Sequence, residues 1–192
     1  FLLVDDIPMQ RVTRMLLTAE QRVLKRILDI AVAVTALIIL SPVMLITAVM
    51  IKLDSKGPVL YSQERVGLYG KTFFVHKFRS MKQDAEAKCG PVLAAEGDPR
   101  ITKFGRFMRA TRLDELPQLF NILAGQMSVV GPRPALWNQD DLIAERDKYG
   151  ANDVVPGLTG WAQIHGRDEL EIADKARLDG YYVEHLSFGM DV

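Results

Sequence analysis

The chain has 192 residues, 25% of them charged, with 24 acidic and 24 basic side chains and therefore a formal net charge of zero. This balance argues against nucleic acid as a partner, because no overall field draws a polyanion to the protein. The single cysteine, Cys89, excludes an intrachain disulfide, and the three histidines lack the spacing of a zinc site. We expect one domain with a membrane element, or a piece of a longer protein.

Residues 1–22 form an N-terminal extension or linker helix of mixed, amphipathic character. Thr18 followed by Gln21 is a capping-box pattern, which predicts a helix that begins near Ala19. This helix runs into the segment 23–53, where no charged side chain lies between Ile30 and Ile51. Such a long apolar run is typical of a membrane-inserted helix rather than of a soluble core.

Ser41-Pro42 interrupts this apolar segment near its middle. Proline removes one backbone hydrogen bond, so the helix should break or kink there. Basic residues flank the segment on both sides, whereas a spanning helix usually carries its Lys/Arg excess on the cytoplasmic side alone. The pattern favours a re-entrant hairpin that leaves on the side it entered, with a kinked span as the alternative. The flanking cations are Lys25, Arg26, Lys52 and Lys56.

Residues 54–192 are expected to form a small cytosolic catalytic domain, so that the fold class is α+β and mainly helical. Val59–Tyr61 and Thr72–His76 read as strands of a short β-hairpin that turns at 67–70. Helices are predicted at 101–110, 111–124, 138–149 and 168–186, with Gly125 ending the second, and a short strand is predicted at Trp161–Ile164.

A basic ladder precedes the most acidic motif of this domain. Its five cations recur every three residues with no acid among them, which predicts an anionic partner such as a diphosphate or a lipid phosphate. The alternative is a solvated helix face. The ladder consists of Arg100, Lys103, Arg106, Arg109 and Arg112.

Asp114-Glu115 directly follows the ladder and has two interpretations. In the structural one, Thr111 is an N-cap and Asp114 is its capping-box partner. In the functional one, the helix dipole and nearby cations stabilise an ionised carboxylate that serves as nucleophile or metal ligand. Two adjacent carboxylates also suit Mg²⁺, which takes one or two of them together with substrate phosphates. The pair therefore indicates phosphoryl transfer.

Two Gly/Pro-rich loops follow. In Gly131-Pro132-Arg133-Pro134, the prolines fix a guanidinium that could clamp a phosphate, or that could instead pair with a helix C-terminus. The segment 156–160, together with Trp161, Gln163 and Arg167, either allows close backbone approach to a ligand or forms an ordinary turn over a core tryptophan.

Six blocks, in this order, resemble the bacterial sugar transferases, which are the monotopic phosphoglycosyl transferases of capsule, exopolysaccharide and glycoprotein pathways. The resemblance extends from about Lys25 to Asp191. The blocks are Lys25-Arg26 with Asp29, Ser41-Pro42, Lys77-Phe78-Arg79-Ser80-Met81, Leu113-Asp114-Glu115-Leu116-Pro117-Gln118, Gly131-Pro132-Arg133-Pro134 and Pro156-Gly157-Leu158-Thr159-Gly160.

The resemblance implies transfer of a sugar-1-phosphate from a UDP-sugar to a polyprenyl phosphate, such as undecaprenyl phosphate, at the cytoplasmic face of the bacterial inner membrane. UMP would be released. Asp114 would be the nucleophile that forms a covalent phosphosugar intermediate, and Glu115 would help to hold Mg²⁺. The substrate-binding candidates are Arg133, Pro134, Arg109, Arg112, Lys77 and Arg79. Membrane lipid is an expected partner, and a homodimer is a further expectation.

The sequence departs from the family pattern at both ends. Asp5-Asp6-Ile7-Pro8 resembles the linker to the N-terminal domains of longer members, and a helix that usually follows Ser187–Asp191 is missing. Two rival functions stay open. One is a non-catalytic membrane adaptor whose basic ladder binds anionic lipid, and the other is a membrane-tethered Mg²⁺-dependent hydrolase of nucleotide diphosphates.

Overall fold

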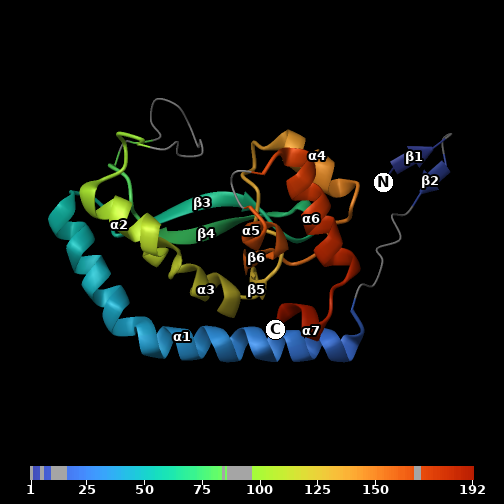
Figure 1. The fold of residues 1–192 in the computed structure, drawn as a ribbon, viewed down its shortest axis with the longest axis horizontal. Coiled ribbons are helices and arrows are strands. Elements are labelled where there is room, and N and C mark those ends of the chain that lie inside the picture. The colour runs from blue at the N-terminus through green and yellow to red at the C-terminus, as the bar shows by residue number, and fades with distance from the viewer. Residues whose placement is uncertain (1, 5–6, 10–16, 84, 86–96, 167–169) are drawn as a thin grey trace.

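The computed structural model describes residues 2–4, 7–9, 17–83, 85, 97–166 and 170–192. It is mainly helical, with one long apolar N-terminal helix and three two-stranded sheets among the described residues. Figure 1 shows this helix, α1, passing along one side of the molecule, with the other helices and the central hairpin above it. The elements are β1 Leu2–Val4, β2 Ile7–Met9, α1 Ala19–Asp54, β3 Leu60–Val66, η1 Leu68–Gly70, β4 Thr72–Phe78, α2 Lys103–Thr111, η2 Leu113–Glu115, α3 Gln118–Leu123, β5 Ser128–Val130, α4 Asp140–Asp147, β6 Gly157–Thr159, α5 Trp161–Ile164, α6 Ile172–Glu184 and α7 Phe188–Asp191.

The start of α1 confirms the capping box. The Thr18 hydroxyl accepts from the Gln21 amide, and the Gln21 side chain accepts from the Thr18 amide. The helix then continues through Pro42 without a break and bends in its middle part (Figure 1). Pro42 has no N–H to offer the Ile38 carbonyl, and the Ser41 hydroxyl donates to that oxygen instead at 2.9 Å. The Ser-Pro pair therefore bends the helix while keeping its backbone satisfied.

Polar contacts fix the first arm of α1 to the rest of the fold. Lys25 Nζ donates to the Val130 carbonyl at 3.0 Å and pairs with Asp191 at 2.5 Å. The Arg26 guanidinium donates to the carbonyls of Ile122 and Leu123, at the end of α3. Because these contacts reach both α3 and β5, the helix is docked on the same elements that carry the candidate site.

Asp29 completes this docking. Its carboxylate accepts from the Ser128 hydroxyl and the Val129 amide, at 2.9 and 2.8 Å. Ala33 then packs in a buried cluster with Leu119 and Ile122 of α3. A buried aspartate that accepts two hydrogen bonds is compensated for its loss of hydration.

The second arm of α1 is held mainly by apolar packing. Ile51 forms a buried cluster with Phe78 of β4 and Met108 of α2. The Arg79 guanidinium then closes the helix end, because it donates to the carbonyls of Ser55 and Lys56 at 2.8 and 2.6 Å. Both arms thus rest on one body, while the outer face of α1 keeps large apolar side chains exposed, such as Ile38 at 71% and Leu45 at 69%.

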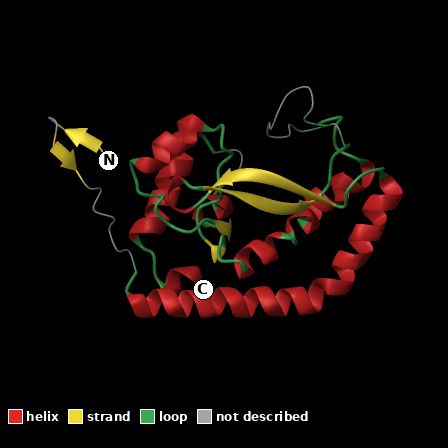
Figure 2. Ribbon diagram, turned by 180° about the vertical axis from the view of Figure 1, so that it is seen from behind, coloured by secondary structure: helices red, strands yellow, loops and turns green. Residues whose placement is uncertain are grey.

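The predicted hairpin is confirmed as the antiparallel pair β3–β4, longer than expected, with the turn at η1. Asn121 of α3 is buried against its edge, where its amide donates to the Phe74 carbonyl and its oxygen accepts from the His76 amide. Asn121 thus makes the two hydrogen bonds to β4 that a neighbouring strand would make, and these hold α3 against β4. These hydrogen bonds join α3 to the central hairpin, which is yellow in Figure 2, next to the Asp114-Glu115 pair, called the dyad below.

The strands β5 and β6 pair in parallel, with Ser128 opposite Gly157 and Val130 opposite Thr159. Their ends come so close that a Cβ on Gly157 would lie 2.1 Å from the Gly131 nitrogen. A Cβ on Gly160 would lie 2.2 Å from the Gly131 oxygen. Glycine is required here because the two backbones touch, which joins the Arg133 loop firmly to the 156–160 segment.

Two element predictions need correction. Trp161–Ile164, predicted as a strand, is the helix α5, and the strand precedes it as β6. The helix predicted at 111–124 is instead a 3₁₀ turn, η2, followed by the six-residue α3. It is interrupted at Pro117, which has no N–H to continue a ladder. Gly125 does follow the end of α3 with a positive φ of 80°, as its predicted role requires.

Candidate functional site

A left-handed residue sets the position of the dyad. Arg112 ends α2 with φ 61° and ψ 16° and precedes η2, so the α-helix stops two residues before Asp114. This conformation costs a non-glycine residue about 1–2 kcal/mol. Thr111, expected to be a helix N-cap with Asp114 as its capping-box partner, instead donates its hydroxyl to the Phe107 carbonyl at 2.8 Å. The capping-box interpretation of Asp114 is therefore wrong in this fold.

Asp114 is buried, with 6% of its surface exposed, and its Oδ1 has no hydrogen-bond partner in the part of the chain that the structure describes. Burial raises the pKa of this carboxyl above its usual value, although Lys77, Arg109 and Arg112 act in the opposite direction. The expectation that cations dominate at this carboxylate is thus wrong in sign, because desolvation is larger. An unpartnered buried acceptor is costly, which makes it a candidate for contact with a ligand.

Glu115 has the opposite environment one residue further on. Its carboxylate accepts from the Arg133 guanidinium at 2.6 Å, with a second, longer contact at 3.5 Å. Burial works against its charge, but the charge and hydrogen bonds of Arg133, together with the charges of Lys77 and Arg112, lower the pKa of Glu115 to about 2. The structure therefore brings together Asp114, Glu115 and Arg133 and keeps Glu115 ionised near neutral pH.

Lys77 supplies a further cation to this group. It lies on β4 on the same strand face as Val75, which packs in the cluster with Leu119 of α3. Burial, together with the charges of Arg133 and Arg65, lowers the pKa of Lys77 to about 7. Asp114 and Glu115 oppose this shift, which places the ammonium within electrostatic reach of both carboxylates.

Residues that the sequence analysis did not single out hold Arg133 in place. Arg146 of α4 donates to the Arg133 carbonyl at 2.8 Å and forms a buried, two-nitrogen ion pair with Asp179 of α6. Arg65 of β3 donates to the Pro134 carbonyl at 3.1 Å. These two arginines hold the carbonyl of Arg133 itself and the carbonyl of the residue that follows it. No sequence signal marked them, because each is an ordinary charged residue far from its partner in the chain.

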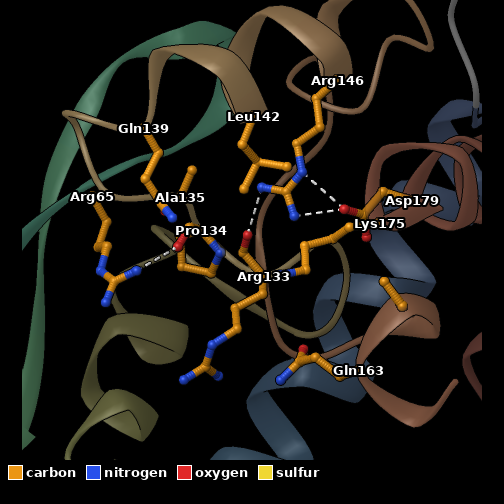
Figure 3. Close-up of a pocket in the computed structure, with 11 residues that line it drawn as sticks. Arg65, Arg133, Pro134, Ala135, Gln139, Leu142, Arg146, Gln163, Lys175 and Asp179 are labelled. Carbon is orange, nitrogen blue, oxygen red and sulfur yellow. Dashed lines mark hydrogen bonds and ion pairs between the residues drawn. The ribbon is translucent and has the colours of Figure 1, made fainter. Parts of the chain in front are cut away.

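A pocket opens beside this loop (Figure 3). Cationic, amide and apolar side chains line it, together with one carboxylate. They are Arg65, Arg133, Arg146, Lys175, Gln139, Gln163, Ala135, Leu142, Ala162 and Asp179. Pro134, a predicted substrate-binding residue, also lines it. The structure therefore joins the Gly131–Pro134 block to Gln163 of the 156–163 segment, whereas Arg167 lies outside the described residues.

Of the remaining predicted residues, some lie near the dyad and others do not. Arg109 donates to the Ser80 hydroxyl at 3.0 Å, and the charges of Arg109 and Arg112 act on Asp114. The described contacts of Arg79 close the end of α1. Arg100 is bound to Asp98 through two nitrogens, so the expectation of five unpaired cations is wrong for this residue. The ladder thus divides between its start, paired with Asp98, and its end beside the dyad.

The carboxylates of the dyad suit a hard divalent cation such as Mg²⁺. Among the described residues, no group of three or more His, Cys, Asp or Glu side chains could hold a metal by itself. Mg²⁺ needs only one or two carboxylates when substrate phosphates and water supply its other ligands. The ionised Glu115 and the unpartnered Oδ1 of Asp114 provide such a donor set.

A family model described as "Bacterial sugar transferase" matches residues 20–192. The chain belongs to this family. The match contains the long helix, the dyad and both Gly/Pro-rich loops, and it confirms the resemblance that the six sequence blocks indicated.

Three relatives illustrate the range of the family. The chain is 44% identical to the "UDP-N-acetylgalactosamine-undecaprenyl-phosphate N-acetylgalactosaminephosphotransferase" of Aeromonas hydrophila, over 88% of this chain and 41% of the relative. It is 41% identical to the "UDP-glucose:undecaprenyl-phosphate glucose-1-phosphate transferase" of Escherichia coli, over 92% of this chain and 39% of the relative. It is 43% identical to the "Exopolysaccharide production protein PSS" of Rhizobium leguminosarum, over 88% and 90%. The chain thus spans about two fifths of the first two relatives and most of the third.

Proposed function

We propose that this chain transfers a sugar-1-phosphate from a UDP-sugar to undecaprenyl phosphate or a related polyprenyl phosphate, an early membrane step in exopolysaccharide, capsule or other glycan assembly. The observation that carries the proposal is the dyad, in which a buried aspartate with an unpartnered oxygen lies beside a glutamate bound to Arg133. Membership of the bacterial sugar transferase family and the printed activities of the Aeromonas and Escherichia relatives support it.

The proposed reaction has two displacements at one phosphorus atom. An Asp114 oxygen attacks the β-phosphorus of the UDP-sugar, the bond to the bridging oxygen breaks, and UMP leaves with that oxygen. A phosphate oxygen of the polyprenyl phosphate then attacks the same phosphorus. The Asp114 oxygen–phosphorus bond breaks, which gives the polyprenyl-diphosphate sugar and restores the carboxylate.

The surrounding residues divide the remaining work. Arg133, held in place by Arg146, offers a planar donor fork to the diphosphate, and Lys77 adds positive charge from β4. Glu115 would hold Mg²⁺ with the substrate phosphates, and the metal would neutralise the charge that develops on the leaving UMP. Burial raises the pKa of Asp114 because it removes water from the carboxyl group. The carboxylate therefore has little further hydration to lose when it attacks.

The test is incubation of the purified enzyme with a UDP-sugar alone, followed by mass spectrometry. We expect UMP release and a phosphosugar adduct on the peptide that contains Asp114. Addition of polyprenyl phosphate should discharge the adduct. A hydrolase would release sugar-1-phosphate into solution without the lipid, and a non-catalytic adaptor would release no UMP, so either result contradicts the proposal.

We further propose that α1 is re-entrant and places the dyad at the cytoplasmic face of the inner membrane. The helix is long and apolar enough to cross a membrane by length and composition. Its bend, and the docking of both arms on one body, support entry and exit on the same side. Single cysteines at Glu20 and Lys56, in a Cys89→Ser background, should be labelled from the same side. Labelling from opposite sides would show a span.

A further inference from the structure

Ser80, two residues after β4, holds α2 at both of its ends. Its backbone carbonyl accepts from the Thr102 amide at 3.1 Å, where the helix begins. The helix lies so close to this carbonyl that a Cβ on Gly105 would come within 2.0 Å of its oxygen. The Ser80 hydroxyl accepts from Arg109 Nε at 3.0 Å, one helical turn after Gly105. Ser80 is buried, so it joins the backbone and one side chain of α2 inside the fold.

This contact uses only one nitrogen of the Arg109 guanidinium. The two terminal nitrogens carry the remaining four of its five N–H donors. In the part of the chain that the structure describes, neither of them has a hydrogen-bond or ion-pair partner. Neither is enclosed by the fold as Asp114 Oδ1 is, so a ligand can reach both. Ser80 therefore fixes the plane of the guanidinium and leaves its fork of donors open.

Arg109 also differs in charge balance from the other arginine beside the dyad. Arg133 is bound to Glu115, and this ion pair compensates its charge. The partner of Arg109 is a neutral hydroxyl, so its charge is not compensated in this way. The charge of Arg109 acts to lower the pKa of Asp114, which places this cation within electrostatic reach of the attacking carboxylate. An open guanidinium fork at this position suits the oxygens of a phosphoryl group.

We propose that Ser80 is a positioning residue, which aims the two terminal nitrogens of Arg109 at a phosphoryl group bound beside Asp114. The inference rests on the proposed function and adds to it a residue that acts through Arg109. The phosphoryl group belongs either to the UDP-sugar or to the polyprenyl phosphate, because both offer the same anionic oxygens. A guanidinium that is already held loses less conformational freedom when it binds.

The test is a double-mutant cycle in the full chain, in detergent or nanodiscs. Ser80→Ala removes the acceptor and should lower kcat/KM for UMP release about tenfold, whereas Arg109→Met should lower it about a hundredfold. Because Ser80 acts through Arg109, the double variant should lose no more than Arg109→Met alone. A merely structural role for Ser80 would make the two losses multiply, and that result would overturn the inference.

Ser62→Ala is the matched control, because the Ser62 hydroxyl also bonds a side chain, that of His76, on the exposed part of the hairpin. This variant should react like the wild type. Ser80→Thr keeps the hydroxyl and should recover most of the activity that Ser80→Ala loses. If Ser80→Ala does not fold, Ser80→Cys, which offers only a weak acceptor, takes its place in the cycle.

Two half-reactions distinguish the sources of the phosphoryl group. If Arg109 contacts the donor, Ser80→Ala should slow the burst of UMP from a UDP-sugar alone. If Arg109 contacts the acceptor, the burst should be normal and discharge of the adduct by polyprenyl phosphate should be slow. Normal rates in both half-reactions would overturn the inference.

Binding of inorganic pyrophosphate, measured by calorimetry, tests the Ser80–Arg109 pair without turnover. Both single variants should bind pyrophosphate more weakly than the wild type, and the double variant should bind it no more weakly than Arg109→Met. Losses that multiply would again overturn the inference. This expected pattern together with no UMP release by the wild type would contradict the transferase proposal alone.

Discussion

Asp114 in η2 and Asp179 in α6 are both buried aspartates, but they have opposite surroundings. Asp179 binds two nitrogens of Arg146 at 2.8 and 2.5 Å, and Arg146 in turn holds the Arg133 carbonyl. Asp114 Oδ1 has no hydrogen-bond partner in the described part of the chain. Burial alone therefore does not identify a reactive carboxylate. The distinguishing property is whether the fold has already used its lone pairs, and on this criterion Asp179 is structural and Asp114 is available.

The largest expected effect comes from Asp114→Asn. The amide keeps the shape of the side chain but cannot form the acyl phosphate, so turnover should fall by about four orders of magnitude or more. Stability should change little, because no hydrogen bond to Oδ1 is lost. Steady-state UMP release and thermal unfolding are measured together, with the exposed Asp141→Asn as control. Substantial turnover by Asp114→Asn would show that Asp114 is not the nucleophile.

Changes at Arg133 should come next. Arg133→Lys keeps a positive charge but loses the planar fork that contacts Glu115, so kcat/KM for the UDP-sugar should fall about a hundredfold. Membrane association should be unchanged, as judged by flotation with vesicles. The exposed Arg177→Lys, whose native partner is the nearby Asp174, serves as the matched control. Wild-type kinetics in Arg133→Lys would show that the fork does not contact the diphosphate.

Variants of the Arg146–Asp179 pair test whether Asp179 has a structural role. Arg146→Met leaves a buried carboxylate without its partner and should lower the free energy of unfolding by about 3–5 kcal/mol. The double variant Arg146→Met/Asp179→Leu removes both charges and should recover much of this loss. Denaturant unfolding in detergent measures both. If the single variant is as stable as the wild type, Asp179 is not held by Arg146 in solution.

The pH dependence should reveal Lys77. Its pKa of about 7 predicts that kcat/KM falls as pH rises through 7, because the neutral amine no longer attracts the diphosphate. The folded pKa lies below the ordinary value of 10.5, so the unfolded chain binds the extra proton between these values. The free energy of unfolding should therefore rise with pH across that interval. Lys77→Met should abolish the step in the kcat/KM profile, and a step that persists would assign the ionisation to another group.

The smallest effect concerns the Ile38 carbonyl, which accepts a hydrogen bond from Ser41. Ser41→Ala removes the donor to the Ile38 carbonyl in an apolar stretch and should cost about 1 kcal/mol of stability. Ser41→Thr keeps the hydroxyl and should cost less. Thermal unfolding of both variants in nanodiscs is the measurement. Equal stability of Ser41→Ala and the wild type would mean that water or lipid headgroups satisfy this carbonyl.

The sequence predicted the parts of the fold that local chemistry determines. The Thr18–Gln21 capping box marked the start of α1, and the Gly-rich turn at 67–70 marked the β3–β4 hairpin. The family resemblance brought together Asp114, Glu115 and Arg133. The backbone conformation around them was not predicted, because an arginine gives no sequence signal for the left-handed conformation that Arg112 adopts.

Long-range pairing accounts for most of the other differences. Arg146 and Asp179 are 33 residues apart, and nothing in either segment indicates that they meet. The same is true of Arg65 and Pro134. The direction of the pKa shift at Asp114 depends on how tightly the fold excludes water, which a linear pattern of charges does not contain. The helix at Trp161–Ile164 was missed because four residues are too short for a periodicity to distinguish helix from strand.

The ion pair between Lys25 and Asp191 has a consequence for how the protein is made. Lys25 lies near the start of the long helix, and its partner lies 166 residues later. The ribosome therefore delivers α1 long before it delivers the residue that locks this end of the helix to the body. During that interval, Lys25 and the apolar face of α1 lack their native neighbours. This end of α1 can therefore be locked to the body only after the chain has been synthesised through Asp191.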